Sequence, residues 1–428
     1  MRPVNERYQV VILGGGFGGL YAAQSLKNVP VEVILIDRRN FHLFQPLLYQ
    51  VATGWLSPAN IASTLRTVLR AQKNARILLA EATDIDVNNR RVILSIGKIP
   101  YDTLIVATGS RHHYFGNDQW ERLAPGLKTV EDAIEIRRRI FFAFEAAERE
   151  VSAQRTHGYL TFIIIGGGPT GVELAGALAD IVNDTLTYDF HRIKQPDVQI
   201  LLVEAADRIL TAYPVELAKK AERFLNQAGV SVKGNSTVTA IDESGVTIKH
   251  GEAIERIPCR TVLWAAGVRA SFLGTVLTRQ TGAKLDRSGR LLVESDLSLR
   301  GHPEVFVIGD LANYIHQTGD PLPGLAPVAM QQGRYVARLL SKRLAGKTTS
   351  PFHYKDRGNM AIVGRGTGVA DLRGVHITGY WAWLAWLFVH LINLVVFENR
   401  VLVLIQWGWY YFRRDRAARL ITGDRYTR

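Results

Sequence analysis

Two glycine-rich motifs have the residue types and spacing that most directly predict chemistry in this chain. They read GGGFGG from Gly14 to Gly19 and GGGPTG from Gly166 to Gly171. In such a motif the first glycine permits a tight turn, the second lets the backbone approach a pyrophosphate, and the third allows close helix packing. The helix N-terminus that follows attracts phosphate charge. One motif alone is weak evidence, but two in equivalent settings predict two bound dinucleotides. The expected contacts are Gly14, Gly16, Phe17, Gly18 and Gly19 in the first motif, and Gly166, Gly168 and Gly171 in the second.

An acidic residue closes the second apolar run after each motif. Asp37 follows residues 31–36, and Glu204 follows residues 198–203. A carboxylate at this position accepts hydrogen bonds from ribose hydroxyls and repels a 2'-phosphate, so both sites are expected to favour a dinucleotide without that phosphate. The alternative is a solvated carboxylate at a strand end. Glu204 comes late after its glycines, because an extended stretch through residues 191–195 intervenes.

These residues need parallel strands to position them. Apolar runs precede both motifs, and the runs ending at Gly109 and Gly267 stop in small residues, which lets a backbone lie against a cofactor. A further run ends at Asp310, where a carboxylate can bind a polyol chain. We therefore predict an α/β fold with two Rossmann-like dinucleotide-binding domains, the second inserted in the first, followed by a membrane-associating helical segment. The expected domains are residues 1–120 with 268–345, residues 121–267, and residues 346–428. Expected local elements include helices over 60–71 and 130–154 and strands around Ile77 and Val92.

The composition excludes several kinds of redox centre. The chain has 428 residues and one cysteine, Cys259, expected to be a buried structural thiol. A dithiol relay needs two cysteines and metal centres usually need several, so we expect neither. The formal net charge of +13 implies attraction to an anionic partner, whether nucleic acid, acidic lipid or protein. The first strand begins within a few residues of the N-terminus, leaving no room for a signal peptide, so a cytoplasmic body is expected.

The composition changes from residue 378 onward. Residues 380–397 and 401–412 are almost wholly apolar, and five of the eight tryptophans lie here. The first run is barely the ~20 residues that span a bilayer. Tryptophan enrichment, the pair Glu398 and Arg400, and a basic tail favour two helices lying in the interface of an anionic membrane. A buried helical hairpin or a dimer interface is the alternative. The tryptophans are Trp381, Trp383, Trp386, Trp407 and Trp409, and the tail arginines are Arg413, Arg414, Arg416 and Arg419.

The ordered set of motifs resembles the type II NADH dehydrogenase family, single-subunit flavoenzymes that pass electrons from NADH to membrane quinone, within the two-dinucleotide-binding flavoproteins. The likeness covers nearly the whole chain. It rests on GGGFGG, the FQPLLYQVATG stretch from Phe44 to Gly54, the Ala-Thr-Gly stop at Gly109, GGGPTGVELAG from Gly166 to Gly176, VIGD ending at Asp310, APVAMQQG from Ala326 to Gly333, and the apolar, tryptophan-rich C-terminus.

The resemblance implies specific roles and a peripheral protein on the cytoplasmic face of the membrane that does not pump protons. FAD would be held by the first motif with Asp37, Thr108, Gly109, Asp310 and Ala329, and NADH by the second motif with Glu204, Gly267 and Glu173. Glu173 would lie beside the nicotinamide and flavin, where it orients the nicotinamide or manages protons; the alternative is a glutamate stabilised by the helix dipole.

APVAMQQG resembles the quinone-facing wall of the family. Gln331 matches its second glutamine, whereas Pro327 replaces the first and Met330 stands where an aromatic residue or histidine is frequent. Gln331 and Gln332 could instead be ordinary polar residues of a helix running to Leu344.

Two other functions fit parts of the sequence. One is a soluble NADH-dependent reductase of a small iron–sulfur or haem protein, docked through the basic surface. The other is a flavin-bound signalling protein whose positive charge engages nucleic acid, although no nucleic-acid motif supports it. The sequence leaves open which quinone is used, whether NADPH is tolerated, and whether the chain forms a homodimer.

Overall fold

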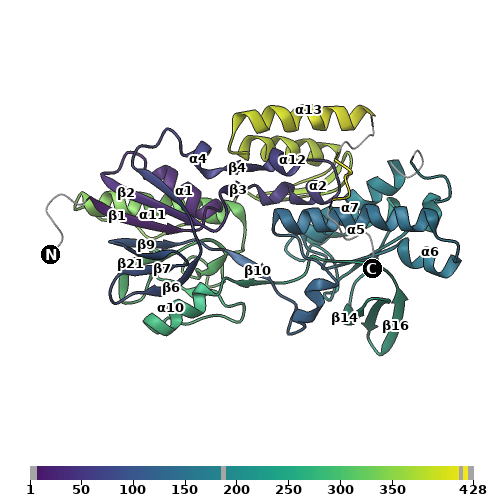
Figure 1. The fold of residues 1–428 in the computed structure, drawn as a ribbon, viewed down its shortest axis with the longest axis horizontal. Helices are drawn as coiled ribbons and strands as arrows, with labels where there is room; N and C mark the ends of the chain where they lie inside the picture. Colours follow the sequence, from purple (N-terminus) through teal and green to yellow (C-terminus); the bar gives the residue numbers. More distant parts are fainter. Residues whose placement is uncertain (1–6, 185–188, 414–417, 423–428) are drawn as a thin grey trace. The chain divides into compact units, whose positions relative to one another are not determined.

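The structure is a computed structural model that describes residues 7–184, 189–413 and 418–422. The backbone divides into two compact units (Figure 1). Unit 1 consists of Met1–Leu43, Ala62–Arg111 and Val268–Asp356, and unit 2 of Phe44–Ile61, His112–Gly267 and Arg357–Arg428. Each unit therefore gathers segments that are far apart in the sequence.

A six-stranded sheet forms the core of unit 1. Its three central strands are rich in buried valine, isoleucine and leucine, as expected for a parallel sheet covered on both faces. Leu13 of the central strand pairs with Ile36 on one side and Val106 on the other. All neighbouring strands are parallel except the edge strand β20, which pairs antiparallel with β21. The strand order is β20 (Ser298–Leu299), β21 (His302–Val307), β9 (Thr103–Val106), β1 (Tyr8–Leu13), β2 (Val31–Asp37) and β5 (Ala75–Leu79).

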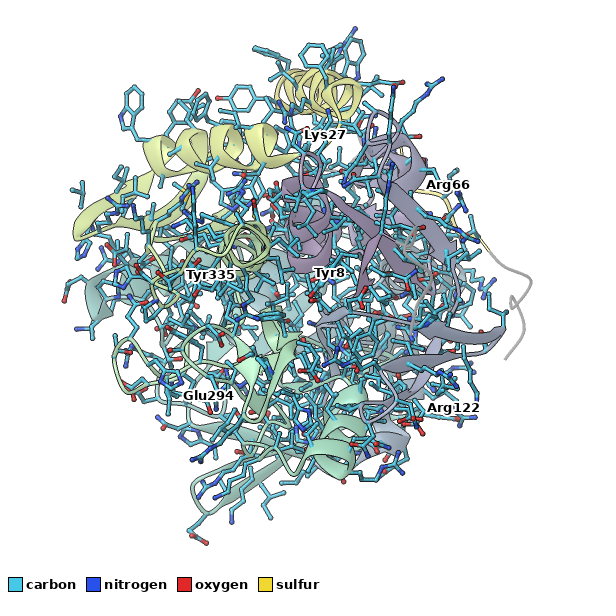
Figure 2. All side chains as sticks on the ribbon, turned by 90° about the vertical axis from the view of Figure 1, so that its left-hand side faces the viewer. Tyr8, Lys27, Arg66, Arg122, Glu294 and Tyr335 are labelled. Atoms are coloured by element: carbon cyan, nitrogen blue, oxygen red, sulfur yellow. The ribbon has the colours of Figure 1, made fainter. Side chains whose placement is uncertain are left out.

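Two helices of unit 1 pack with their backbones in close approach. These are α1 (Phe17–Ser25) and α11 (Ala326–Leu344). A Cβ added at Gly333 would overlap the carbonyl oxygen of Gly18, so only glycine permits this crossing. Tyr335, labelled in Figure 2, donates its hydroxyl to the Ser350 carbonyl at 2.8 Å and fixes the segment after α11. The remaining elements are β3 (Phe41–Leu43), β4 (Ala62–Thr64), α4 (Leu65–Val68), β6 (Ala82–Asp86), β7 (Arg91–Leu94), β8 (Gly97–Pro100), β10 (Ser110–His112), β18 (Val268–Ala270), α10 (Leu273–Thr281), β19 (Leu291–Leu292), η4 (Gly309–Leu311) and β22 (Ala312–Asn313).

The helix expected over residues 60–71 is wrong. The chain instead forms α3 (Pro58–Ile61), the strand β4 and α4. Residues 62–64 are extended because they pair with β3, with Phe41 opposite Thr64. This pairing with a distant segment overrides the local helical pattern. The helix expected over 130–154 is also divided, into α5 (Val130–Arg149) and α6 (Ala153–Tyr159).

Unit 2 is built on a second parallel sheet. Its central strand β11 (Thr161–Ile165) leads directly into α7 (Pro169–Asp184), and the strand order is β13 (Val230–Lys233), β12 (Gln199–Val203), β11 and β17 (Thr261–Trp264). The two parallel sheets with their helices confirm the α/β class. Cys259 is buried in the core beside this sheet. Unit 2 also contains η1 (Gln45–Leu47), α2 (Leu48–Ala52), η2 (Asp118–Arg122), η3 (Gln195–Asp197), α9 (Val215–Gln227), β14 (Ser236–Asp242), β15 (Gly245–His250) and β16 (Ala253–Pro258).

The C-terminal part of unit 2 is an antiparallel sheet followed by two helices. The strands are β23 (Asn359–Gly364), β24 (Thr367–Leu372) and β25 (Val375–Gly379), and the helices are α12 (Tyr380–Asn393) and α13 (Phe397–Arg413). Figure 1 shows the two helices side by side in yellow. The expectation of two helices is confirmed. With 14 residues α12 is about 21 Å long, and across residues 7–184, 189–413 and 418–422 no helix combines the length and apolar character that a bilayer crossing requires.

Candidate active site

The two glycine motifs adopt the same backbone geometry. Gly14 and Gly166 have φ of +102° and +108°, in the region that favours glycine. Their N–H groups each donate at 2.8 Å to a carbonyl at or next to the end of the neighbouring strand, that of Ile36 for Gly14 and that of Val203 for Gly166. A Cβ at Gly19 would overlap the Gly14 carbonyl oxygen, and one at Gly171 would overlap that of Gly166. Both motifs are therefore tight strand-to-helix turns that only glycine can form.

The second glycine of each G-x-G-x-x-G pattern, Gly16 in the first motif and Gly168 in the second, has open space in front of it. Among the described residues, leaving aside the adjoining backbone, no atom lies within 4 Å of a Cβ built at Gly16 or at Gly168. Glycine at these positions is thus not explained by packing within the described residues. A phosphate approaching the backbone at the start of α1 or α7 would explain it.

The two strand-end carboxylates also occupy equivalent places. Asp37 accepts the N–H of Gly15 at 2.6 Å and that of Arg39 at 2.7 Å. Glu204 accepts the N–H of Gly167 at 2.5 Å and that of Ala206 at 2.8 Å. Burial raises the pKa of Asp37, while the backbone N–H groups oppose this rise. Each carboxylate lies against its motif, and its oxygens retain lone pairs for ribose hydroxyls.

Other groups of unit 1 fit a bound dinucleotide. The Thr108 hydroxyl oxygen is buried without a hydrogen-bond partner in the described part of the chain, so an external donor or acceptor would satisfy it. Gly109 follows with φ of +65° and open space at its Cα. Ser110 donates its hydroxyl to Asp310 at 2.7 Å. Sequence reasoning missed His42, whose Nδ1 lies 3.0 Å from the Gly15 carbonyl and whose ring meets Phe17 edge-on. Burial lowers the pKa of His42 and keeps its ring neutral.

The two adjacent glutamines of helix α11 have different surroundings and different hydrogen-bond partners. Gln332 is buried and accepts the Gly309 N–H at 2.6 Å. The Gln331 amide bonds the backbone of Lys355 twice, accepting its N–H and donating to its carbonyl, each at 3.0 Å. Ala329 is buried, and its methyl group would lie 3.5 Å from a Cβ at Gly309. Gln332, which the sequence did not single out, therefore holds the turn that carries Asp310.

Glu173 is buried on the face of α7 that the C-terminal sheet covers. Its Oε1 accepts the indole N–H of Trp386 at 3.2 Å and the N–H of Ile362 at 3.5 Å. Burial raises the pKa of Glu173 to about 8, and the two hydrogen bonds oppose this rise. The carboxyl thus titrates close to neutral pH, which suits a group that takes up and releases protons.

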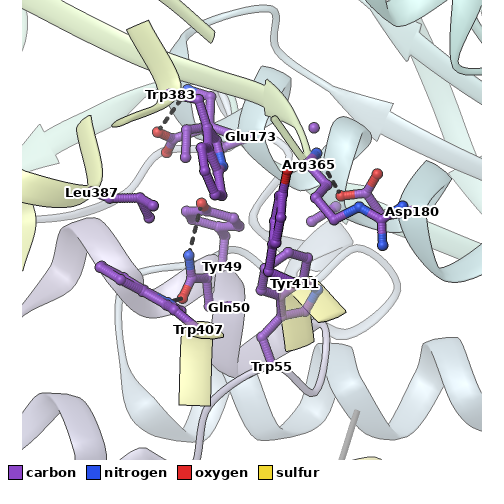
Figure 3. A pocket seen from close by; sticks show the side chains of 13 residues that line it. Tyr49, Gln50, Trp55, Glu173, Asp180, Arg365, Trp383, Leu387, Trp407 and Tyr411 are labelled. Carbon is purple, nitrogen blue, oxygen red and sulfur yellow. Dashed lines mark hydrogen bonds between the residues drawn. The ribbon is translucent and has the colours of Figure 1, made fainter. Parts of the chain in front are cut away.

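A small cavity adjoins this carboxyl (Figure 3). Its volume of about 20 Å³ is room for roughly one water molecule. Trp407 donates its indole N–H to Gln50 Oε1 at 2.8 Å, and Gln50 donates to the Tyr49 hydroxyl at 3.1 Å. The lining residues are Tyr49, Gln50, Trp55, Glu173, Ala177, Asp180, Ile362, Gly364, Arg365, Trp383, Leu387, Trp407 and Tyr411. The cavity therefore combines aromatic walls with polar groups from α2 and α7.

The C-terminal tryptophans fall into two groups. Trp381 and Trp409 are 71% and 57% exposed, whereas Trp383, Trp386 and Trp407 are buried. Tryptophan enrichment is the basis for predicting two interfacial helices, and three of the five rings are buried within unit 2, so only Trp381 and Trp409 are exposed among them. Of the tail arginines, Arg419 pairs with Asp189, and Arg414 and Arg416 lie outside the described residues.

Comparisons place the chain among known proteins. A family model described as pyridine nucleotide-disulphide oxidoreductase matches residues 8–333. The type II NADH:quinone oxidoreductase NdhA of Mycobacterium tuberculosis is 43% identical over 431 residues, covering 98% of this chain and 91% of the relative. The type II NADH:quinone oxidoreductase of Staphylococcus haemolyticus is 30% identical, covering 87% and 92%. The solved structure of NDH2 from Plasmodium falciparum in complex with NADH has a TM-score of 0.88 at 19% identity, covering 98% of this chain and 100% of that chain, and shows a common fold.

Proposed function

The chain belongs to the type II NADH:quinone oxidoreductase family, and on that premise we propose that it passes two electrons from NADH through bound FAD to a membrane quinone. The observation that carries this proposal is the pair of glycine turns with equivalent geometry, each with a strand-end carboxylate on its backbone. Two dinucleotides in one chain are what a flavin enzyme reduced by NADH needs. The absence of a second cysteine leaves no dithiol relay to compete with quinone.

The two sites bind different cofactors in this proposal, FAD at the first glycine motif and NADH at the second. We propose that Gly16, Asp37, Thr108 and Asp310 hold FAD. Bound FAD supplies the chemistry that accepts hydride and returns two electrons. Gly309, held by Gln332, keeps the Asp310 carboxylate in place for the polyol chain.

NADH would be held by the second motif. Gly168 gives its pyrophosphate access to the backbone, and Glu204 receives its ribose hydroxyls and disfavours a 2'-phosphate. Gly267 follows β17, the strand that pairs with β11 before this motif. The quinol formed carries two hydrogens, while NADH delivers one hydride, so each turnover takes one proton from water. Glu173, buried yet titrating near neutral pH, is the group of this chain that we propose holds that proton.

Anaerobic stopped-flow spectroscopy of the purified flavoprotein tests the proposal. NADH should bleach the flavin absorbance, and a short-chain quinone should restore it. If the quinone fails and a small iron–sulfur or haem protein restores the absorbance, the soluble reductase is the correct function. Negligible turnover combined with a salt-sensitive DNA complex would instead favour the signalling protein.

The exposed face of α12 and α13 supports a membrane site for the acceptor. Large apolar side chains gather there, including Trp381 at 71% and Phe412 at 83% exposure. Exposed apolar side chains of this kind on a basic protein suit an anionic bilayer surface. We propose that these helices lie in the interface and present the protein to lipid-dissolved quinone, on the cytoplasmic side where NADH is found. The exposed residues are Tyr380, Trp381, Phe388, Val389, Ile392, Phe397, Val401, Leu402, Leu404, Ile405, Trp409, Tyr411 and Phe412.

Polar substitution of this face should weaken membrane binding. We expect Trp381→Ser, Phe388→Ser and Phe412→Ser together to reduce partitioning onto anionic vesicles by at least about tenfold, because burial of each aromatic ring contributes over a kilocalorie per mole. The measurement is co-sedimentation with phosphatidylglycerol vesicles. Ile254→Ser, 71% exposed on β16, is the matched control. Unchanged partitioning with a shift from dimer to monomer would show that a second copy covers the face instead.

A further inference from the structure

Trp386 makes an unusual contact for a residue of an apolar C-terminal helix. It is 1% exposed, and its indole N–H is directed to the Glu173 carboxylate at 3.2 Å. The second donor to that oxygen, the Ile362 N–H, lies at 3.5 Å and is weaker. Indole nitrogen can only donate. Trp386 therefore makes the shorter of the two hydrogen bonds to a buried carboxylate 213 positions earlier in the chain, and it is the side-chain donor of the pair.

The surrounding elements fix the indole in this place. A Cβ at Gly176 of α7 would overlap the Val363 carbonyl, so α7 lies directly against β23. On β24, a Cβ at Gly368 would come within 3.3 Å of the Trp383 backbone nitrogen, so α12 also lies close to the sheet, although less tightly. The Trp386 ring stacks on His390 with centroids 3.7 Å apart. Glycines on two elements thus bring α7 and α12 close enough for one side chain to join them.

His390 holds the stack without adding charge. Its Nδ1 lies 2.7 Å from the Trp386 carbonyl, one helical turn earlier, so Nδ1 carries the proton that it donates. Burial lowers the pKa of His390 to about 4, which leaves the ring neutral at physiological pH. The indole N–H is therefore the group of α12 that acts electrostatically on Glu173.

The charged and titratable groups around Glu173 come from each element packed against it. Burial and the Glu173 charge raise the pKa of both the Tyr49 and Tyr213 hydroxyls, which keeps them neutral. Asp180 is bonded to the N–H of Arg365 at 3.1 Å. Tyr49 on α2, Asp180 on α7 and Arg365 after β23 line the cavity beside Glu173. Tyr213 before α9 interacts with Glu173 and with Asp371 on β24, and His390 on α12 stacks on Trp386.

We propose that Trp386 is a positioning residue, which holds the Glu173 carboxylate through its indole N–H and so makes proton exchange at Glu173 depend on α12 being docked. The inference rests on the proposed function, in which Glu173 holds the proton that quinone reduction consumes. Helix α12, which we place in the membrane interface, would then also control proton exchange at the buried carboxyl group of Glu173. A protein whose α12 is displaced loses this control while both dinucleotide motifs remain intact.

The test removes the N–H and follows the titration of Glu173. In Trp386→Phe the pH midpoint of quinone-dependent turnover should rise by about one unit, because the carboxylate loses a hydrogen bond that favours its charged form. Trp120→Phe is the matched control, since this buried indole lies in the core cluster around Trp264 rather than beside Glu173, and its midpoint should stay unchanged. In a Glu173→Gln background, Trp386→Phe should produce no shift.

Two further measurements separate this proposal from a packing effect and from a failure of the proposed function. Replacement of Trp386 by 3-benzothienylalanine keeps the bicyclic shape and lacks the N–H, so it should reproduce the shift even if Trp386→Phe does not fold. Infrared difference spectra between wild type and Glu173→Gln report the protonated carboxyl directly, without turnover. An unmoved infrared midpoint in the benzothienyl protein overturns the proposal, whereas a moved midpoint with no quinone reduction sustains it and overturns the quinone assignment.

Discussion

Gly171→Ala should destabilise the protein, whereas Gly168→Ala should leave its stability nearly unchanged and weaken NADH binding. A Cβ at position 171 would overlap the Gly166 carbonyl oxygen, which the backbone of the turn cannot avoid. We expect a loss of about 3 kcal/mol in the free energy of unfolding. A Cβ at position 168 meets no atom within 4 Å in the described part of the chain beyond the adjoining backbone. The methyl group would instead stand where we place the pyrophosphate.

The Gly168→Ala variant should raise the KM for NADH by at least about tenfold, which corresponds to about 1.4 kcal/mol of lost binding. Steady-state kinetics and urea unfolding of the same preparations check both parts. Gly16→Ala is the matched change in the first motif, where open space also surrounds the Cβ. It should lower the flavin content, while Gly168→Ala should leave flavin content intact. If Gly16→Ala raised the KM for NADH and Gly168→Ala depleted flavin, the two sites would have to be exchanged.

The glycine motifs were predictable from sequence because their geometry is local. Positive φ at Gly14 and Gly166 and the overlap at Gly19 and Gly171 arise within six residues of chain. The apolar runs around them are continuous, as parallel strands require. The α/β class with two equivalent turns follows from these local rules.

The helix over residues 60–71 could not be corrected from sequence. Residues 62–64 become a strand only because residues 41–43 lie beside them. A hydrogen-bonded partner about twenty positions away decides the backbone there. Single-residue propensities carry no information about that partner.

The glutamines of α11 show a second limit. Gln331 and Gln332 are adjacent and identical in type, so the sequence alone does not indicate which of the two is buried. Successive helix residues point about 100° apart, and the approach of α11 to α1 at Gly333 decides which side chain is buried. Gln332 then reaches Gly309, while Gln331 faces the backbone of Lys355.

The tryptophans show the same limit at the C-terminus. Enrichment of tryptophan indicates an interface on average, yet Trp386 and Trp407 are buried donors to Glu173 and Gln50. Each of these pairs joins segments more than 200 residues apart. One apolar sequence therefore does two things: its inner face bonds to buried polar groups, and its outer face remains exposed and apolar.

Glu173→Gln should slow turnover strongly and change the pH dependence of stability. A positioned acid or base typically contributes about 10²-fold or more to a rate, so we expect a loss of kcat of that order with unchanged flavin content. Gln keeps the shape of the side chain and an oxygen that can accept the Trp386 N–H. Kinetics of NADH oxidation identical to wild type would show that Glu173 is a buried structural residue.

The stability part of this prediction follows from the raised pKa. Glu173 titrates at about 8 when folded, against a usual value of 4.5. Between these values the unfolded chain has lost the proton that the folded protein keeps, so the free energy of unfolding falls as pH rises. The stability that the raised pKa of Glu173 contributes is fully present below about pH 4.5 and has been lost above about pH 8.

Glutamine does not titrate, so the variant should gain stability relative to wild type as pH rises through this window, by a few kcal/mol. Urea unfolding at the two ends of the window measures the difference. Glu216→Gln, an exposed carboxylate in the first turn of α9, should show no comparable gain. A stability difference that stays constant between the two pH values would mean that Glu173 is ionised throughout, and it could then not hold the proton for quinone.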